Sequence, residues 1–282
     1  MAETFYTFYG VRGSYPVAGD SVKKYGGNTT SLLIEKDKDI IIFDAGTGII
    51  NLGEYLKTKR SDVKDISIFI THYHLDHIMG VSFFSPLSDK DYKIKIYYPD
   101  IENSNGGDVL FNLIEPPYSP IGKEGIHANI EMIGLNITKD CMVSINKDLT
   151  VAYHYDTLHP VNGVMLYKLE TGAKKLVFAT DIESVGEFAK NLKDFIFDSD
   201  VLIHDSQYLD EDYNSKTEPT KGYGHSTFDM AVQNAIECNT KKLFLFHHNP
   251  LYSDEKLEGI LGTVRKKFKN SFLARELDKN IL

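Results

Sequence analysis

Six consecutive residues, His72-Tyr73-His74-Leu75-Asp76-His77, bring together three imidazoles and one carboxylate. They follow the apolar run Ile66 to Ile70, which predicts a strand that ends where this cluster begins. Imidazole nitrogens and carboxylate oxygens bind zinc and similar divalent ions, and alternate residues of an extended turn point to the same side. We therefore predict that His72 and His74 bind one ion and that Asp76 and His77 reach a second.

Two other interpretations of these histidines are a surface loop that happens to be rich in histidine, and core histidines that hydrogen bond to the backbone. Four such residues at this spacing, in a chain with ten histidines, favour the metal site. A two-metal site needs ligands from elsewhere in the chain. Three candidates lie at or just beyond predicted strands: His159, Asp181 and His247.

Short apolar strands and helices are interspersed along the chain. Helices are predicted at Ile49 to Lys59 and at Thr227 to Glu237, the second with Thr227 as its N-cap. Because polar residues repeatedly follow a strand, we expect a layered α/β or α+β architecture with the site along one sheet edge. The predicted strands are Thr4 to Tyr9, Thr30 to Glu35, Asp39 to Phe43, Ile66 to Ile70, Lys93 to Tyr98, Thr150 to Tyr155, Val164 to Leu169, Lys175 to Ala179, Val201 to Ile203 and Lys242 to Phe246.

The segment from Ser82 to Asn146 is the least regular part of the sequence and contains several prolines and glycines. Long loops within a domain are usually functional or carry small elements of their own. We expect a lid or pocket wall here. Tyr118 and Phe111 within it are candidates for stacking on a base, although such residues more often belong to a core.

Composition limits the classes of partner. The 282 residues carry 31 Lys+Arg and 40 Asp+Glu, and the formal net charge of -9 gives no overall attraction to a polyanion such as nucleic acid. Cys141 and Cys238 are far apart and indicate neither a disulfide framework nor a thiolate metal site. No signal peptide or membrane span is evident, so we expect a cytoplasmic protein without membrane partners.

The H-x-H-x-D-H run resembles the signature of the metallo-β-lactamase superfamily. Other family motifs follow in order: Phe43-Asp44-Ala45-Gly46-Thr47-Gly48 resembles the first, His159 the third, Ala179-Thr180-Asp181 the fourth and Phe246-His247 the last. The resemblance covers nearly the whole chain. It implies an α+β fold, the four-layer αββα sandwich of two mixed β-sheets flanked by helices, formed by residues 1–282 as a single hydrolase domain.

The same resemblance implies two divalent metal ions, with zinc as the first choice and manganese or iron as alternatives. It assigns His72, His74 and His159 to one ion, and Asp76, His77 and His247 to the other, with Asp181 bridging them. A bridging water that has lost a proton would be the nucleophile. His247 fits the family's register better than His248. Asp44 either orients ligand histidines or caps a helix in a glycine turn.

A further motif points to one branch of the superfamily. His204-Asp205-Ser206-Gln207 and Gly224-His225-Ser226-Thr227 resemble two motifs of the ribonuclease Z branch, whose members cleave phosphodiesters. The resemblance implies catalytic roles for Asp76 as a ligand, for His225 as the general acid and for Asp205 as the residue that orients it. Asp205 replaces the family's glutamate, which shortens the reach to His225. The alternative makes His225 only the neighbour of a helix cap.

The substrate prediction is a small phosphodiester, first of all a cyclic nucleotide. The segments Tyr9 to Pro16 and Tyr25 to Thr30 resemble a bacterial subgroup described as cyclic-nucleotide phosphodiesterase-like. Arg12 in the first of them is either a phosphate ligand or a surface arginine. tRNA-processing members carry a long arm before the strand of the bridging aspartate, and His159 and Asp181 are too close for one. The alternatives are a ribonuclease Z-like tRNA 3′-processing endonuclease and a non-catalytic metal-binding sensor, and the resemblance also allows a homodimer.

Overall fold

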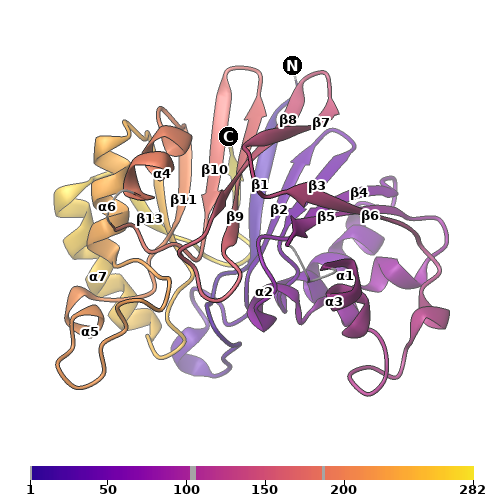
Figure 1. Ribbon diagram of the computed structural model, residues 1–282, viewed down its shortest axis with the longest axis horizontal. Helices are drawn as coiled ribbons and strands as arrows, with labels where there is room; N and C mark the ends of the chain where they lie inside the picture. Colours follow the sequence, from indigo (N-terminus) through magenta and orange to yellow (C-terminus); the bar gives the residue numbers. More distant parts are fainter. Residues whose placement is uncertain (1, 102–105, 186–187) are drawn as a thin grey trace. The chain divides into compact units, whose positions relative to one another are not determined.

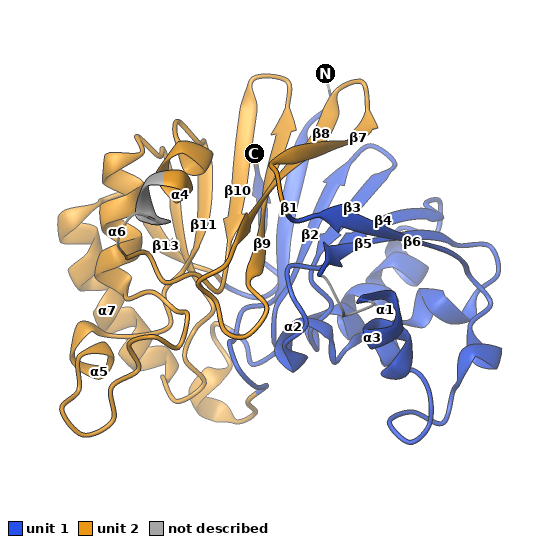
Figure 2. Cartoon of the chain, in the orientation of Figure 1, with its two compact units in different colours: residues 1–16, 26–137, 275–281 blue, residues 17–25, 138–274, 282 orange. Residues whose placement is uncertain are grey.

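The computed structural model describes residues 2–101, 106–185 and 188–282, and the chain divides into two units (Figures 1 and 2). Unit 1 consists of residues 1–16, 26–137 and 275–281, and unit 2 of residues 17–25, 138–274 and 282. Each unit contains one seven-stranded mixed sheet with its own helices. None of the helices in these described ranges combines the length and the apolar composition that crossing a membrane requires.

The sheet of unit 1 has the strand order β14-β1-β2-β3-β4-β5-β6. Strands from β14 to β3 pair antiparallel and those from β3 to β6 pair parallel. Helix α1 packs Ile49, Leu52 and Leu56 into the apolar core of this unit. The elements are β1 (Thr4–Gly10), β2 (Ser31–Lys36), β3 (Asp39–Phe43), α1 (Gly48–Lys59), β4 (Asp65–Phe69), α2 (Leu75–Ile78), β5 (Lys93–Asp100), α3 (Gly106–Asn112), β6 (Asn129–Asn136) and β14 (Lys279–Ile281), with 3-10 turns at Val81–Phe83, Ser85–Ser88 and Lys123–Gly125.

The sheet of unit 2 has the order β13-β12-β11-β10-β9-β8-β7. Here the strands from β13 to β10 pair parallel and those from β10 to β7 pair antiparallel. Thr227 caps α6 by accepting a hydrogen bond from the Met230 amide at 3.2 Å, as the sequence predicts. The elements are a 3-10 turn (Asp20–Val22), β7 (Cys141–Asn146), β8 (Leu149–Asp156), β9 (Val164–Thr171), β10 (Lys174–Ala179), α4 (Phe188–Ile196), β11 (Val201–Asp205), α5 (Asp210–Tyr213), α6 (Phe228–Glu237), β12 (Leu243–Phe246), α7 (Asp254–Lys267) and β13 (Ser271–Leu273).

The strands and helices predicted from the sequence are present with bounds that differ by at most two residues. The segment 82–146 is more regular than the sequence indicates, because besides the predicted β5 it contains α3, β6 and β7. Strand β6 pairs with β5 over eight residues and β7 pairs with β8, each at the edge of its sheet. Edge strands are half exposed, so their sequences lack the apolar run that reveals a central strand. Residues 102–105 of this segment lie outside the described part of the chain.

Several strands end in a sharp turn at a residue of the predicted site. Asp44 follows β3 with φ 63°, Asp181 follows β10 after one residue with φ 56°, and His247 follows β12 with φ 60°. Few residues other than glycine adopt this left-handed conformation, although aspartate and histidine do so more often than most. In each unit, the carboxyl ends of adjacent parallel strands therefore present polar side chains along one edge of the sheet.

Candidate metal centre

Unit 1 holds the contiguous cluster, which we define as His72, His74, Asp76 and His77. It begins three residues after the end of β4 and continues into the short helix α2. The His72 ring lies 4.5 Å from the His74 ring and 4.2 Å from the His77 ring, measured between centroids. The Nε2 atom of His77 lies 3.3 Å from Oδ2 of Asp76. Three imidazoles and a carboxylate thus converge within one loop of unit 1.

A buried carboxylate from the neighbouring strand holds this loop in place. Oδ1 of Asp44 accepts the Thr71 amide at 2.8 Å, and Oδ2 lies 2.9 Å from the Thr71 hydroxyl and 2.7 Å from Nδ1 of His77. An ionised carboxylate can only accept, so Nδ1 of His77 carries the proton and Nε2 keeps its lone pair. Burial raises the pKa of Asp44, and the His77 ring and Thr71 act against that rise.

The helix-cap interpretation of Asp44 is wrong, because the residue at the N-cap of α1 is Thr47. A second contact on the contiguous cluster comes from the N-terminal loop, where the Ser14 amide donates to Oδ2 of Asp76 at 2.7 Å. Arg12 in that loop is fully buried and donates from Nε to the Gly26 carbonyl at 2.8 Å. It is therefore not the surface arginine that one interpretation of the sequence expects.

Unit 2 holds a dispersed cluster, which we define as His159, Asp181, Asp205, His225 and His247. One ligand-type atom from each of four of them, Asp181, Asp205, His225 and His247, lies within 4.8 Å of the others, and all four are buried. Asp181 is central, since its carboxylate lies 3.3 Å from Nε2 of His247 and 3.6 Å from Nε2 of His159. Each residue arrives from a different strand end or loop of unit 2.

His159 and His225 each have one ring nitrogen fixed by a hydrogen bond. Nδ1 of His159 donates to the Gly224 carbonyl at 3.0 Å, so its Nε2 remains available as a ligand atom. Nδ1 of His225 lies 2.7 Å from Oδ2 of Asp205. Asp205 therefore reaches His225 in spite of being one methylene shorter than the family's glutamate. Its other oxygen accepts the amides of Ser226 and Gln207 at 3.2 and 3.1 Å.

The neighbouring histidines 247 and 248 have different surroundings. The ring of His247 stacks on that of His225 at 5.0 Å, next to Asp181. His248 instead donates from Nε2 to the Ala274 carbonyl at 2.8 Å, and its ring lies 6.1 Å from that of Tyr25. The geometry within unit 2 thus agrees with the choice of His247 as the ligand candidate.

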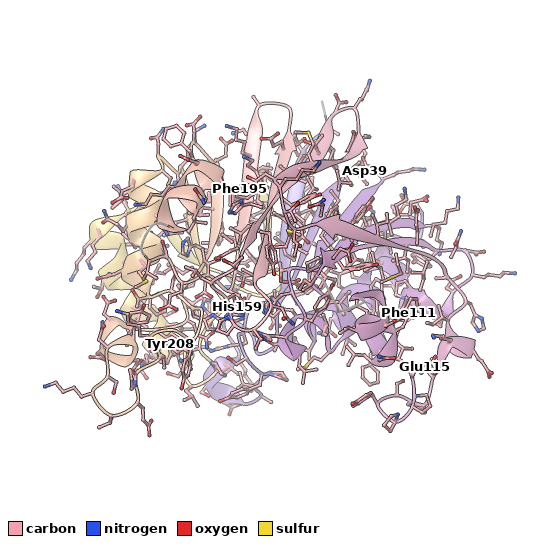
Figure 3. The ribbon with its side chains drawn as sticks, viewed as in Figure 1. Asp39, Phe111, Glu115, His159, Phe195 and Tyr208 are labelled. Atoms are coloured by element: carbon pink, nitrogen blue, oxygen red, sulfur yellow. The ribbon has the colours of Figure 1, made fainter. Side chains whose placement is uncertain are left out.

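The sequence did not point to Tyr208, which also borders the dispersed cluster. Its ring meets that of His225 edge-on at 5.9 Å, and its hydroxyl accepts from Nε2 of Gln207 at 3.2 Å. Figure 3 labels Tyr208 together with His159. Burial raises the pKa of Tyr208, and the charges of Asp205 and Asp181 raise it further, so the phenol keeps its proton. It lies three residues after the end of β11, and an aromatic residue just beyond a strand carries no distinctive signal.

The family model of the β-lactamase superfamily domain matches residues 40–248. The chain belongs to the metallo-β-lactamase superfamily. It lies in the ribonuclease Z-like branch and is a metal-dependent hydrolase. Both clusters suit a divalent metal ion, because they consist of imidazole and carboxylate donors. Asp44 fixes Nδ1 of His77 and the Gly224 carbonyl fixes Nδ1 of His159, so the Nε2 atom of each ring is left to face a metal.

Two curated relatives and two solved structures are similar to this chain. The chain is 27% identical to "Ribonuclease Z" of Picrophilus torridus over 98% of this chain and 96% of that protein, and 25% identical to "Ribonuclease Z" of Nanoarchaeum equitans over 92% and 89%. It shares its fold with the metallo-β-lactamase fold protein YhfI from Bacillus subtilis, with a TM-score of 0.73, 15% identity and 100% coverage of both chains. The short form of human tRNase Z has a TM-score of 0.70 and 19% identity, with 98% of each chain covered.

Proposed function

We propose that this chain is a dinuclear metal-dependent phosphodiesterase that hydrolyses a small phosphodiester, with His225 as the general acid. The observation that supports it is the buried pair of His225 and Asp205, joined at 2.7 Å, beside Asp181 and His247. A hydrolase that acts on a metal-bound ester with a good leaving group needs no such proton donor. A phosphodiester that releases an alkoxide does.

The ligand sets that we propose are the ones that the family resemblance implies. His72, His74 and His159 bind one ion, and Asp76, His77 and His247 bind the other, with Asp181 bridging. The family match from residue 40 to 248 includes ligands of both units, which supports a single hydrolase domain built from the two. Bound divalent ions lower the pKa of a coordinated water and polarise a phosphoryl oxygen. Zinc is the first choice for this donor set, ahead of manganese and iron.

His225 has the arrangement that a proton donor requires. Because the ionised Asp205 carboxylate accepts from Nδ1, that nitrogen keeps its proton and the ring is fixed in orientation. A proton on Nε2 can then pass to the leaving oxygen as water adds to phosphorus and the P–O bond breaks. Asp205 stabilises the protonated ring before this transfer. The ring is returned to its starting state by a proton from the water that was consumed.

A small substrate, such as a cyclic nucleotide, is favoured by the short connection before Asp181. Strands β9 and β10 form a hairpin in which only residues 172 and 173 lie between Thr171 and Lys174. That hairpin leaves no room for the arm which the resemblance associates with tRNA binding. The net charge of -9 also opposes a tRNA ligand. Segment 82–146 supplies the lid or pocket wall in this proposal, with Tyr118 exposed for contact.

The second candidate is a tRNA 3′-processing endonuclease. It is favoured by the two relatives named ribonuclease Z, which match over about nine-tenths or more of both chains. A solved structure of "a New Diphosphatase from the PhnP Family" has a similar fold, with a TM-score of 0.68, 19% identity and coverage of 98% and 97%. Proteins named for a ribonuclease and for a diphosphatase thus share this fold.

The experiment is hydrolysis of a panel by the zinc- or manganese-loaded protein. The panel contains 3′,5′-cAMP, 3′,5′-cGMP, 2′,3′-cAMP, bis(p-nitrophenyl) phosphate, a pre-tRNA and a β-lactam. We expect turnover of cyclic nucleotides that is lost in His72→Ala and reduced about 10²-fold or more in His225→Ala. His154→Ala, at a histidine of β8 that lies outside both clusters and outside segment 82–146, is the control. Cleavage of pre-tRNA alone would select the second candidate, and metal binding without any turnover would indicate a sensor.

A further inference from the structure

Glu183 is a buried carboxylate that belongs to neither ligand set. It lies two residues after Asp181 and is only 5% exposed. Its partners all come from one stretch of unit 2. Oε1 accepts the hydroxyl of Tyr213 and the amide of Gly222 at 2.9 Å, and Oε2 accepts the amide of Gly224 at 3.2 Å. Glu183 thus binds both ends of the loop from Tyr213 to Gly224.

That loop leads directly to two residues of the dispersed cluster. The Gly224 carbonyl is the acceptor for Nδ1 of His159, and the next residue is His225. Gly222 and Gly224 both have left-handed φ values, 87° and 83°. A chain with two such residues has many accessible conformations when unfolded or loosened. Its path before His225 therefore has to be fixed by contacts from outside the loop.

The residues beside Glu183 hold the other side of His225. The Ser226 hydroxyl donates to the Ile182 carbonyl at 2.6 Å, and the Ser184 amide donates to that hydroxyl at 3.3 Å. The segment 182–184 therefore contacts the chain both before and after His225. It is also the segment that follows Asp181, so the central carboxylate and the histidine are fixed to the same three residues.

We propose that Glu183 is a positioning residue that sets the orientation of His225 by fixing the loop that leads to it. This inference rests on the proposed function, because it assumes that His225 is the proton donor. A buried carboxylate that accepts backbone amides keeps its geometry through charge-assisted hydrogen bonds. A glutamine there must turn an NH₂ group toward at least one of these donors, which leaves a buried amide without its acceptor.

The test compares Glu183→Gln with Glu218→Gln, which changes an exposed glutamate of the same loop. Two substrates are used: a cyclic nucleotide, whose alkoxide leaving group needs a proton, and bis(p-nitrophenyl) phosphate, whose phenolate does not. For Glu183→Gln we expect kcat on the cyclic nucleotide to fall about 10- to 100-fold with KM nearly unchanged, and kcat on the p-nitrophenyl ester to fall less than about threefold. Glu218→Gln should leave both values unchanged.

Two further measurements separate positioning from a general loss of structure. In the His225→Ala background, Glu183→Gln should add no further loss on the cyclic nucleotide, because the two residues act through one proton transfer. Hydrogen exchange of the zinc-loaded protein should show faster exchange at Gly222 and Gly224 in Glu183→Gln alone. If Glu183→Gln folds poorly, Tyr213→Phe removes a single donor and should give the same substrate selectivity with a smaller loss.

The outcomes distinguish the two hypotheses. If His225→Ala slows both substrates equally, the proton-donor role fails, and the positioning role of Glu183 fails with it. If His225→Ala is selective for the cyclic nucleotide but Glu183→Gln slows both substrates equally, or adds its full loss in the double variant, the positioning role alone is overturned. Selective loss, no additivity and faster exchange in Glu183→Gln would together support it.

Discussion

The two units hold their ligand candidates in opposite ways. In unit 1, the contiguous cluster comes from a single loop after β4, braced by Asp44 at the end of the adjacent strand. In unit 2, the dispersed cluster is gathered from the ends of β8, β10, β11 and β12 and from the loop before α6. A single loop needs only a few contacts to hold several ligands in place. Side chains from five places come together only when the whole sheet of unit 2 has formed.

Each unit also uses a buried carboxylate behind a histidine, but for a different task. Asp44 of unit 1 holds Nδ1 of His77, which is a ligand candidate. Asp205 of unit 2 holds Nδ1 of His225, which we propose to be the proton donor, while His159 is held by a backbone carbonyl. In our proposal, the same kind of hydrogen bond thus orients a metal ligand in one unit and a general acid in the other.

The largest expected effect tests whether both units supply metal ligands. We expect His72→Ala in unit 1 and His247→Ala in unit 2 each to lower kcat/KM by roughly 10³-fold or more, because a lost ligand removes several kcal/mol of charge stabilisation. Metal content, measured by plasma emission spectrometry after dialysis, should fall in both variants. His154→Ala is the control. A His247→Ala variant with full metal content would show that His247 is not needed to hold the ions.

The next effect contrasts the two carboxylates. Asp44→Asn keeps the size of the side chain and tolerates the left-handed conformation at this position, and it should weaken metal affinity about 10- to 100-fold by disturbing His77. Asp205→Asn should leave metal content unchanged and lower kcat on substrates with an alkoxide leaving group. Chelator competition measures the first variant, and turnover of the two test substrates measures the second. Equal metal loss in both variants would contradict the proposal that Asp44 orients a metal ligand whereas Asp205 orients the proton donor.

A smaller effect is expected from the backbone acceptor in unit 2. In Gly224→Ala, the new Cβ would lie 2.4 Å from Nδ1 of His159, whereas in Gly222→Ala it would meet nothing within 4 Å. Both glycines have similar left-handed φ values, so the cost of backbone strain is matched. We expect Gly224→Ala to lower metal affinity about tenfold relative to Gly222→Ala, since His159 must shift. Chelator competition on both variants measures the difference. Equal affinities would show that the contact between Gly224 and His159 does not affect metal binding.

The same contrast explains what the sequence revealed. The contiguous cluster was predicted from the residues alone, since His72 to His77 stand together after an apolar strand. His159, Asp181 and His247 were candidates from the residues alone, but their places in the ligand sets and the roles of Asp205 and His225 came from the family resemblance. Residues such as Asp181 and Asp205 are far apart in sequence and become neighbours only when β10 and β11 pair. Their local signal is no more than a polar residue at a strand end.

Other features could not be predicted because they depend on tertiary contacts. Glu183 resembles any glutamate after a strand until its partners from the loop before His225 are seen. Strands β6 and β7 escaped prediction because one face of an edge strand meets solvent, so polar and apolar residues are mixed. The central strands β3 and β10 were found, because burial on both faces requires a continuous apolar run.

The smallest expected effect on catalysis is at Asp156, the last residue of β8, where we expect stability to change and kcat to stay constant. Its carboxylate accepts the Leu158 amide at 2.7 Å, and asparagine can keep that bond. Burial raises the pKa of Asp156 to about 7 from its ordinary value of 3.8. Below that ordinary value the carboxyl is protonated in both the folded and unfolded chain.

As pH rises from about 4 to about 7, the unfolded chain releases the Asp156 proton while the folded chain retains it, so this residue makes the protein progressively less stable. Above about pH 7 the loss is constant. Asp156→Asn lacks this group, and at pH 8 we expect it to gain up to a few kcal/mol over the wild type, at about 1.4 kcal/mol per pKa unit. Urea unfolding of both chelator-treated proteins at pH 4, 6 and 8 measures the gain. A gain that does not grow between pH 4 and pH 8 would show that the Asp156 carboxyl ionises as readily in the folded chain as in the unfolded one.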